Sequence, residues 1–248
     1  FGFGDALGID LPNEKGGLLP SREWKKKTLN SSWHRGETLL SGIGQGYLLA
    51  TPLQMVVMAA RLANGGASVI PRMTYPVRSL NSDDFDHDPS HTSLFDPSVP
   101  PLKNLGITPS HLKLVRQAME GVTANPLGTA FKSRIRKLGR QMAGKTGTVQ
   151  VRRISSLERE EGVRKNEDLP WRERDHAAFV GFAPIHSPRY AVSIIVEHGG
   201  VSSVAASIAR DILELAQGRK SAQPGVRPKG PGSSLSENAK QVIKNPKL

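Results

Sequence analysis

Two short apolar runs near the end of the chain constrain its fold more than any other feature. Residues 177–183 and 191–196 are rich in β-branched and aromatic side chains, and the proline-bounded segment 184–188 separates them. This pattern is typical of two strands joined by a turn, so we expect a hairpin. A helical pattern follows directly, which predicts a sheet with a helix packed on it.

Three helices are predicted around these strands. Thr51-Pro52-Leu53-Gln54 has the form of a capping box with a first-turn proline, and an apolar run then predicts a buried helix that ends near Asn64-Gly65-Gly66. Thr108-Pro109 begins a second, amphipathic helix. The apolar positions at helical spacing are Leu112, Val115, Met119 and Val122 in this helix, and Val204, Ile208, Ile212 and Leu215 on one face of a final helix that ends at Gly218. The expected fold class is α/β, an α+β sandwich in which helices cover a largely antiparallel sheet.

Length and composition exclude several classes of protein. The chain has 248 residues, of which 37% are hydrophobic, as suits one sizeable globular domain or a large piece of one. It has no cysteine, which excludes a disulfide, a thiolate metal site and a thiol nucleophile, and no pattern indicates a metal or a cofactor. No apolar run approaches the roughly 18 to 20 residues of a membrane span. The chain begins at Phe1 without an initiator methionine, as we expect of an internal fragment or a processed product.

The net charge of +12 is concentrated in two segments. Residues 218–248 hold seven basic residues against Glu237 alone, among prolines, glycines and serines, so we expect a disordered basic tail. Residues 132–153 hold eight basic residues and no acidic one, which fits either an anionic partner or a solvated basic face. Residues 81–101 are expected to form an exposed loop. Because no nucleic-acid recognition motif accompanies the charge and aromatic residues are only 5% of the chain, we expect no nucleic-acid partner.

The residues that carry chemistry lie in the run 141–151, which has the propensity of a strand and contains Lys145-Thr146-Gly147-Thr148. These residue types suit a peptide that ends in a carboxylate. Lys145 would supply positive potential, the hydroxyls of Thr146 and Thr148 would donate to the carboxylate, and Gly147 would leave room for the substrate. The backbone N–H of Thr148 is a candidate oxyanion donor. Strict alternation places Lys145 and Gly147 on one face and the threonines on the other, so a shared site requires strand twist or an approach along the strand edge.

Besides the lysine-threonine-glycine triplet, the sequence contains the run Gly42-Ile43-Gly44-Gln45-Gly46-Tyr47, followed by Thr51-Pro52-Leu53-Gln54-Met55. In the serine transpeptidases and β-lactamases such a triplet lies on a strand that lines the active-site cleft. The run resembles the loop and helix that precede this strand in the class B penicillin-binding proteins, and the resemblance to this family covers about residues 1 to 217. The segments similar to elongation-type members are Phe1-Gly2-Phe3-Gly4 with Gly8-Ile9-Asp10-Leu11-Pro12, Arg22-Glu23-Trp24-Lys25, and Arg174-Asp175-His176-Ala177.

The resemblance implies a fold, an activity and a set of partners. The fold is the penicillin-binding transpeptidase fold shared with serine β-lactamases, and the activity is peptidoglycan D,D-transpeptidation in cell-wall elongation. A serine attacks the penultimate D-alanine of a stem peptide that ends in D-Ala-D-Ala, and β-lactams acylate the same serine. A glycosyltransferase partner, an N-terminal anchor in the bacterial inner membrane and a periplasmic site of action are also implied. In these terms, residues 1–217 are the C-terminal part of a transpeptidase domain, and residues 218–248 are its tail.

Two motifs of the family do not occur in the required order. The family has a serine-x-x-lysine motif and then a serine-x-asparagine motif, both well before the lysine-threonine-glycine strand. Ser110-His111-Leu112-Lys113 lies only 35 residues before Lys145, on the predicted amphipathic helix, and serine-x-asparagine occurs at Ser79-Leu80-Asn81 and Ser236-Glu237-Asn238. We therefore expect the nucleophile and its general base to lie upstream of Phe1, and the chain alone to be inactive.

Three hypotheses remain open at this point. The first is a piece of an elongation-type transpeptidase. The second is a non-catalytic, penicillin-binding-like interaction module, which a genuine start codon near Phe1 would favour. The third is a nucleic-acid binder, which strong, salt-sensitive DNA binding without residues 218–248 would favour. Within the enzyme class, the alternative is a division-type transpeptidase or a relative of the serine β-lactamases, and rapid turnover of bound penicillin would indicate a β-lactamase.

Overall fold

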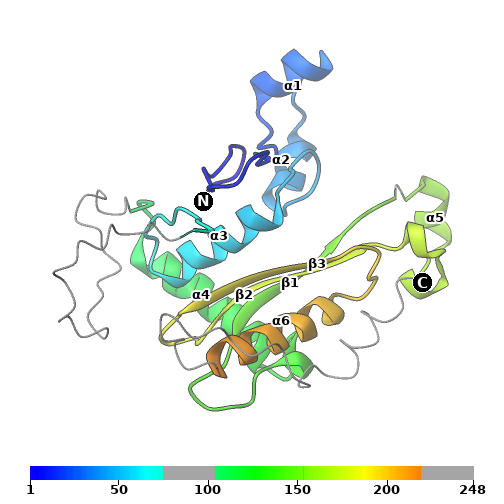
Figure 1. Ribbon diagram of the computed structural model, residues 1–248. Helices are drawn as coiled ribbons and strands as arrows, with labels where there is room; N and C mark the ends of the chain where they lie inside the picture. The colour runs from blue at the N-terminus through cyan, green and yellow to red at the C-terminus, as the bar shows by residue number, and fades with distance from the viewer. Residues whose placement is uncertain (75–103, 153, 219–248) are drawn as a thin grey trace, which may run out of the picture. The chain divides into compact units, whose positions relative to one another are not determined.

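The computed structural model of the chain describes residues 1–74, 104–152 and 154–218 (Figure 1). The exposed loop expected at residues 81–101 and, apart from Gly218, the tail expected at residues 218–248 lie outside the described residues. Contacts divide the chain into two units. The first unit comprises residues 1–50 and 67–106, and the second comprises residues 51–66 and 107–248.

A three-stranded antiparallel sheet forms the centre of the second unit. Its strands are β1 (Ala143–Val149), β2 (His176–Ala183) and β3 (Tyr190–Val196), in the order β1-β2-β3. β2 and β3 are the two apolar runs, and they pair in the register Phe179 with Ile194, which confirms the expected hairpin. β1 is the strand with the lysine-threonine-glycine triplet, and its register on β2 pairs Lys145 with Val180.

Helix α3 (Pro52–Ala63) begins as its sequence predicts. The Gln54 N–H donates to the Thr51 hydroxyl over 3.2 Å, and the Thr51 N–H donates to the Gln54 side-chain oxygen over 3.0 Å. These two bonds form the capping box, which satisfies backbone donors that a helix N-terminus otherwise leaves without partners. Gln54 is fully buried, so the cap lies within packed structure.

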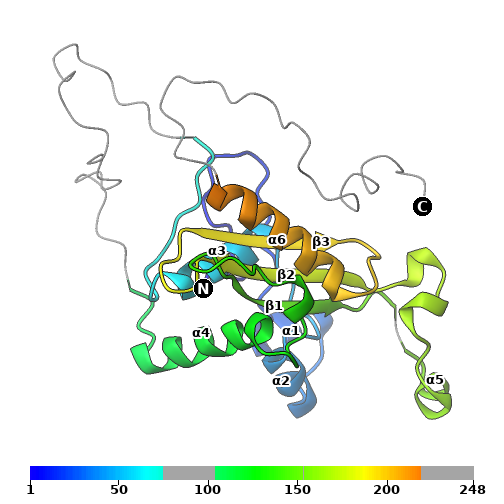
Figure 2. The same ribbon diagram turned by 90° about the horizontal axis from the view of Figure 1, so that it is seen from below.

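Helices cover both faces of the sheet, so the expected α/β class is confirmed. Helix α6 (Ser202–Gly218) packs on one face, as Figure 2 shows from below. On the other face, Leu62 and Ala63 of α3 and two side chains of α4 (Pro109–Ala124) pack against Ala143 and Phe182 of the sheet. The sheet therefore lies between two apolar layers, and β1 occupies one side of it.

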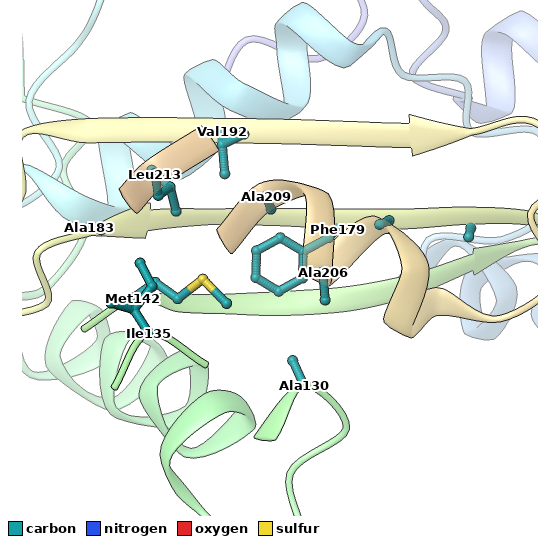
Figure 3. Packing of buried hydrophobic residues seen from close by; sticks show 11 residues of the cluster. Ala130, Ile135, Met142, Phe179, Ala183, Val192, Ala206, Ala209 and Leu213 are labelled. Carbon is teal, nitrogen blue, oxygen red and sulfur yellow. The ribbon is translucent and has the colours of Figure 1, made fainter. Parts of the chain in front are cut away.

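Phe179 is the largest side chain in the cluster beneath α6, where it is 1% exposed. Figure 3 shows its ring between the sheet and the alanines of α6, with Met142 beside it. Two strand glycines make room for this ring. A Cβ on Gly144 would lie 2.2 Å from the Phe179 Cζ atom, and a Cβ on Gly181 would lie 2.8 Å from its Cε1 atom. Close packing in this layer thus requires glycine at both positions.

The buried face of α6 is not the apolar stripe that marks this helix in the sequence. Of that stripe, Val204, Ile212 and Leu215 are 39%, 45% and 45% exposed. The buried face instead consists of Ala205, Ala206, Ala209 and Leu213. Alanine leaves space for the helix to approach the sheet closely, and Phe179 fills the space that these small side chains leave. Helical spacing alone did not distinguish this face from the neighbouring one.

The connection between β1 and β2 contains helix α5 (Ser156–Glu161) and two short 3-10 turns, η3 (Asn166–Asp168) and η4 (Trp171–Glu173). Its end is fixed at the start of β2. The Asp175 N–H donates to the Asn166 side-chain oxygen over 2.8 Å, and the Asp175 carboxylate accepts from the Asn166 amide and from the Val151 N–H. Asp175 therefore joins the two ends of this connection.

The first unit contains helices α1 (Arg22–Leu29) and α2 (Arg35–Gly42). Lys25 joins them, since its buried ammonium donates to the Glu37 carboxylate over 2.5 Å and to the Ser32 carbonyl over 2.7 Å. The backbone N–H of His34 and the Lys25 ammonium both lower the pKa of Glu37. A charged, hydrogen-bonded pair thus occupies a position where an unpaired lysine would be costly.

Candidate substrate-binding strand

The lysine-threonine-glycine triplet lies in the middle of β1. One side of β1 pairs with β2, and no other strand of the described residues pairs with its other side. We call the side of β1 that faces away from β2 the outer edge. An outer edge presents backbone N–H and C=O groups that an extended peptide can bind. The hydrogen-bonding groups available to a ligand therefore depend on which residues of β1 direct their backbone N–H and C=O to this edge.

Three hydrogen bonds fix this direction. The Gln141 carbonyl accepts from the Ile185 N–H, on the β2 side, over 3.0 Å. By contrast, the Met142 carbonyl accepts from the Thr123 hydroxyl on α4 over 2.6 Å, and the Thr146 carbonyl accepts from the Lys145 ammonium over 2.7 Å. The two backbone groups of a residue in an antiparallel strand point to the same side, and that side alternates along the strand. Even-numbered residues of β1, including Thr148, therefore direct N–H and C=O to the outer edge.

Strand alternation separates the Lys145 side chain from the two threonine side chains, but the direction of the backbone groups still allows all three residues to contribute to one site. The Lys145 side chain and the hydrogen that replaces a side chain at Gly147 lie on one face of β1, and the side chains of Thr146 and Thr148 lie on the other, as the sequence predicts. The Lys145 and Thr148 side chains are both exposed. The Thr148 N–H lies between the two faces, on the outer edge. A ligand that approaches along this edge can meet the Thr148 N–H together with exposed side chains from both faces.

Thr146 differs from its neighbours because it is only 7% exposed. Its hydroxyl lies 2.7 Å from the hydroxyl of Thr129, which is exposed and comes from the turn after α4. Sequence reasoning did not identify Thr129, which belongs to none of the motifs that resemble the family. The contact joins residues 17 positions apart, and a predicted strand and a predicted helix do not specify it.

The Ser110-x-x-Lys113 sequence lies on the first turns of α4, where both side chains are exposed. This position agrees with the expectation that the sequence match is unrelated to catalysis. Lys113 lies on the polar side of a helix whose buried residues are Leu112, Met119 and Thr123. An exposed serine and an exposed lysine on a solvated helix face are ordinary surface residues.

The glycine-rich run before α3 forms turns within the first unit. Gly44 and Gly46 have φ angles of 73° and 82°, which favour glycine, and the Gln45 N–H donates to the Leu40 carbonyl at the end of α2 over 2.9 Å. Tyr47 packs on Trp24 of α1 with 5.3 Å between ring centroids. Two segments with the family resemblance are therefore in contact within this unit.

An ion-pair cluster organises the start of the β1–β2 connection. Arg152 donates two hydrogen bonds to the Glu158 carboxylate, over 2.5 and 2.6 Å, and the Arg164 N–H donates to it over 3.2 Å. Hydrogen bonding by Arg152 holds the pKa of Glu158 at about 2. At neutral pH this connection is thus tied together by a bidentate pair.

Two further properties concern metals and membranes. Within the described part of the chain, no three His, Cys, Asp or Glu side chains gather as a metal site would require. No helix in residues 1–74, 104–152 and 154–218 combines the length and the apolar character needed to cross a bilayer.

The triplet lies on an edge strand of a sheet whose two faces are covered by helices. This is the arrangement of the serine transpeptidases and β-lactamases. Residues 1–214 match the family described as Penicillin binding protein transpeptidase domain. The chain belongs to this family, as the resemblance in its sequence implied.

Several similar relatives are named peptidoglycan D,D-transpeptidase MrdA. MrdA of Salmonella typhimurium (strain SL1344) is 37% identical over 217 residues, which cover 86% of this chain and 32% of that protein. MrdA of Escherichia coli (strain K12) is 34% identical over 214 residues, which cover 86% of this chain and 31% of that protein. The chain thus spans about a third of the length of the curated relatives it matches.

Two solved structures of penicillin-binding protein 2 confirm the expected fold. The protein from Helicobacter pylori, in its complex with MreC, has a TM-score of 0.65 at 30% identity. The match covers 87% of this chain and 34% of the Helicobacter pylori chain. The protein from Pseudomonas aeruginosa, in complex with WCK 5153, has a TM-score of 0.65 at 34% identity. The match covers 88% of this chain and 41% of the Pseudomonas aeruginosa chain. The similarity to penicillin-binding protein 2 agrees with the elongation-type resemblance in the sequence.

Proposed function

We propose that this chain forms one wall of the active site of a peptidoglycan D,D-transpeptidase of cell-wall elongation. The acylated serine and its general base belong to sequence outside these 248 residues, because the two serine motifs of the family do not occur here in the required order. The substrates are stem peptides that end in D-Ala-D-Ala, and β-lactams acylate the same serine. The similarity to MrdA proteins supports this proposal.

The outer edge of β1 is the observation that carries the proposal. Lys145, Thr146, Gly147 and Thr148 lie along it. The exposed Lys145 ammonium gives the edge a positive charge, which attracts the C-terminal carboxylate of a stem peptide. The hydroxyl of the exposed Thr148 donates a hydrogen bond to that carboxylate, with Thr146 next to it along the strand. The absence of a side chain at Gly147 lets the peptide lie against the strand.

The backbone N–H of Thr148 serves as an oxyanion donor in this proposal. The serine oxygen forms a bond to the penultimate D-alanine carbonyl carbon, and negative charge develops on the carbonyl oxygen. An N–H fixed in a strand stabilises this charge without reorganising. The peptide bond then breaks, and the terminal D-alanine leaves with a protonated amine. An amine from a neighbouring stem peptide attacks the acyl-serine, forms the new amide bond and returns the serine to its hydroxyl form.

The same proposal assigns partners and location. The elongation-type family works with a glycosyltransferase, at the inner membrane, with the transpeptidase domain in the periplasm and a membrane anchor N-terminal to it. We assign these properties to the whole protein that contains this chain. The complex of Helicobacter pylori penicillin-binding protein 2 with MreC supports an MreC-type protein as a further partner.

Labelling with a fluorescent penicillin tests the proposal. The 248-residue chain is compared with an extended protein, which adds the in-frame coding sequence upstream of Phe1. We expect a covalent adduct on the extended protein, at a serine upstream of Phe1, and no adduct on the 248-residue chain by intact mass. An adduct on Ser110 would contradict the assignment, and an extended protein that is not acylated would overturn the proposed function.

Lys145→Ala in the extended protein tests the role of the strand. Because the Lys145 side chain is exposed, its removal should leave the fold intact while acylation slows by at least about tenfold. Lys113→Ala removes a second exposed lysine, on α4, and is the matched control. Equal acylation rates for the two variants would show that Lys145 is not part of the site.

A further inference from the structure

The hydroxyl groups of Thr129 and Thr146 form a pair between an exposed residue and a buried one. Their oxygens lie 2.7 Å apart. Thr146 is 7% exposed, whereas Thr129 is exposed. A hydroxyl has one hydrogen to donate, so only one of the two hydrogens lies between the oxygens and the other remains for a third group.

Burial decides which hydrogen lies between the two oxygens. Among the described residues, Thr129 is the hydrogen-bond partner of the Thr146 hydroxyl. A buried donor without an acceptor costs more than an unused lone pair, so the arrangement that satisfies the pair has Thr146 donating to Thr129. The Thr129 hydrogen is then directed to the exposed side, and the bond from Thr146 strengthens Thr129 as a donor.

The position of Thr129 places this donor beside the outer edge of β1. α4 packs against β1, and its Thr123 donates to the outward carbonyl of Met142. The turn that follows α4 therefore lies along this edge, and Thr129 belongs to it. The side chains of Thr146 and Thr148 lie on the same face of β1, and Thr148 is exposed. Thr129 and Thr148 thus present two hydroxyls from one side.

The backbone around Thr129 is fixed by its own contacts. The Gly128 N–H donates to the Asn125 carbonyl over 2.8 Å, and the Ala130 N–H donates to the Val122 carbonyl over 3.1 Å. A Cβ on Gly128 would lie 2.3 Å from the Val122 carbonyl oxygen, so the turn approaches α4 too closely for any other residue. Ala130 is 1% exposed, which anchors the turn from its other side. A donor held in this way is pre-organised for a ligand.

We propose that Thr129, an exposed residue, is a substrate-binding residue whose hydroxyl, oriented by Thr146, donates to the C-terminal carboxylate of the stem peptide or of a β-lactam. The proposal rests on the proposed function and adds a residue from outside the strand to the same site. Thr146 acts in it as a positioning residue, because its own hydroxyl is turned toward Thr129. The carboxylate accepts hydrogen bonds from Thr129 and Thr148, next to the charge of Lys145.

Acylation of the extended protein by a penicillin and by its carboxyl methyl ester provides the test. Thr129→Val should slow acylation by the acid roughly 10- to 100-fold, the range for a lost hydrogen bond to a charged group, and should change the ester rate little. Thr129→Ser keeps the hydroxyl and should retain the rate for the acid. Thr129→Asp places a negative charge at the exposed site and should slow only the acid. Thr123→Val, which removes a buried hydroxyl on α4, is the matched control for a structural defect.

The outcomes separate this proposal from the proposed function. A preference for the acid that is lost in Thr129→Val and Thr129→Asp and kept in Thr129→Ser supports the role of Thr129. Unchanged acylation of Thr129→Val, or an equal loss for acid and ester, overturns it. Absence of acylation in the unsubstituted extended protein overturns the proposed function and this assignment with it, a result that differs from acylation that is insensitive to Thr129.

Discussion

Each residue of β1 has one of two backbone environments, and this distinction allows a single N–H to be tested. The odd-numbered residues direct their N–H groups into the ladder with β2, whereas the even-numbered residues direct theirs to the outer edge. Proline has no N–H, and sheets accept it at edge positions where the missing group faces outward. Proline substitutions therefore distinguish a catalytic N–H from a structural one.

Thr148→Pro is expected to remove the proposed oxyanion donor while the sheet survives. The Gly147 residue before it tolerates the backbone restriction that proline imposes. Loss of one oxyanion donor slows acyl transfer about 100- to 1,000-fold, so acylation of the extended protein by penicillin should fall by that order. Thr148→Val keeps the N–H and removes only the hydroxyl, so it should slow acylation less. The rates come from stopped-flow labelling, and circular dichroism reports on the fold.

Val149→Pro is the matched control for this experiment. Its N–H points toward β2, opposite His176, so proline there removes a ladder bond and should lower the unfolding temperature. If Thr148→Pro acylates as fast as the unsubstituted protein, the Thr148 N–H is not an oxyanion donor. If it unfolds as readily as Val149→Pro, the direction assigned to the backbone groups is wrong.

The sequence indicated four residues of the candidate site and did not indicate Thr129, which we propose as a fifth, for a physical reason. Lys145, Thr146, Gly147 and Thr148 are adjacent in the chain, so a local motif is enough to find them. Thr129 joins them only because the turn after α4 follows the outer edge of β1. A contact of this kind depends on how a helix and a strand pack, which local sequence patterns do not encode.

At the scale of an element, the segment that contains α5 should lose stability in acid when Glu158 is protonated. The folded pKa of about 2 lies below the ordinary value of 4.5, so the stabilisation by Glu158 is present above about pH 4.5 and is lost as the pH falls toward 2. NMR titration of the Glu158 carboxyl carbon should give a midpoint near 2. Glu158→Gln should make the Arg164 amide exchange faster at pH 6, because that N–H loses a charged acceptor.

Glu167→Gln is the control for this titration. Glu167 pairs with Lys165 over 3.8 Å, and the two side chains are 76% and 77% exposed, so the pair contributes little. The exchange rate of the Arg164 amide should not respond to this change. A Glu158 midpoint near 4.5 in the unsubstituted chain would show that the bidentate pair with Arg152 does not form in solution.

The packing of β1 on Phe179 makes Gly144→Ala a severe change. The added Cβ would lie 2.2 Å from the ring and 2.7 Å from the Val180 carbonyl oxygen, and the carbonyl cannot move without breaking the ladder. We expect a loss of at least about 2 kcal/mol in the free energy of unfolding, measured from urea midpoints. Gly147→Ala places its Cβ 3.4 Å from Ala178 and should cost less than about 1 kcal/mol.

A double-mutant cycle identifies the cause of this loss. Phe179→Leu removes the ring and destabilises the core by itself. Because it also vacates the space that the new methyl group needs, Gly144→Ala should cost less in the Phe179→Leu background. An equal cost in both backgrounds would attribute the effect to the strand backbone alone.

The final helix shows what periodicity can and cannot determine. Its length and position were predicted because Val204, Ile208, Ile212 and Leu215 repeat at helical spacing. Its buried face was not, since that face is mostly alanine, and alanine carries little weight in a hydrophobic pattern. The size of the Phe179 ring opposite determines which face fits, and a single-helix pattern contains no information about the facing layer.

At the scale of the whole molecule, half of the net charge lies in a segment that contributes nothing to the described cores. The described cores lie before residue 219, whereas residues 219–248 carry seven basic residues and one acidic residue, a net charge of +6 that is half of the chain's +12. Charge of this kind governs non-specific association with polyanions and does not determine the fold. Truncation of the tail can therefore separate the binding of polyanions from the stability of the fold.

A chain that ends at Gly218 should keep its stability and lose much of its affinity for polyanions. Its urea midpoint should equal that of the 248-residue chain, because no described core residue is removed. Its binding to duplex DNA at low salt, measured by fluorescence anisotropy, should weaken, with a salt dependence reduced by roughly 0.9 per lost phosphate contact. DNA binding that is equally strong and equally salt-sensitive after truncation would place the contacts in residues 132–153. That result would favour an anionic partner for this basic run, and a nucleic-acid function would then compete with the proposed transpeptidase.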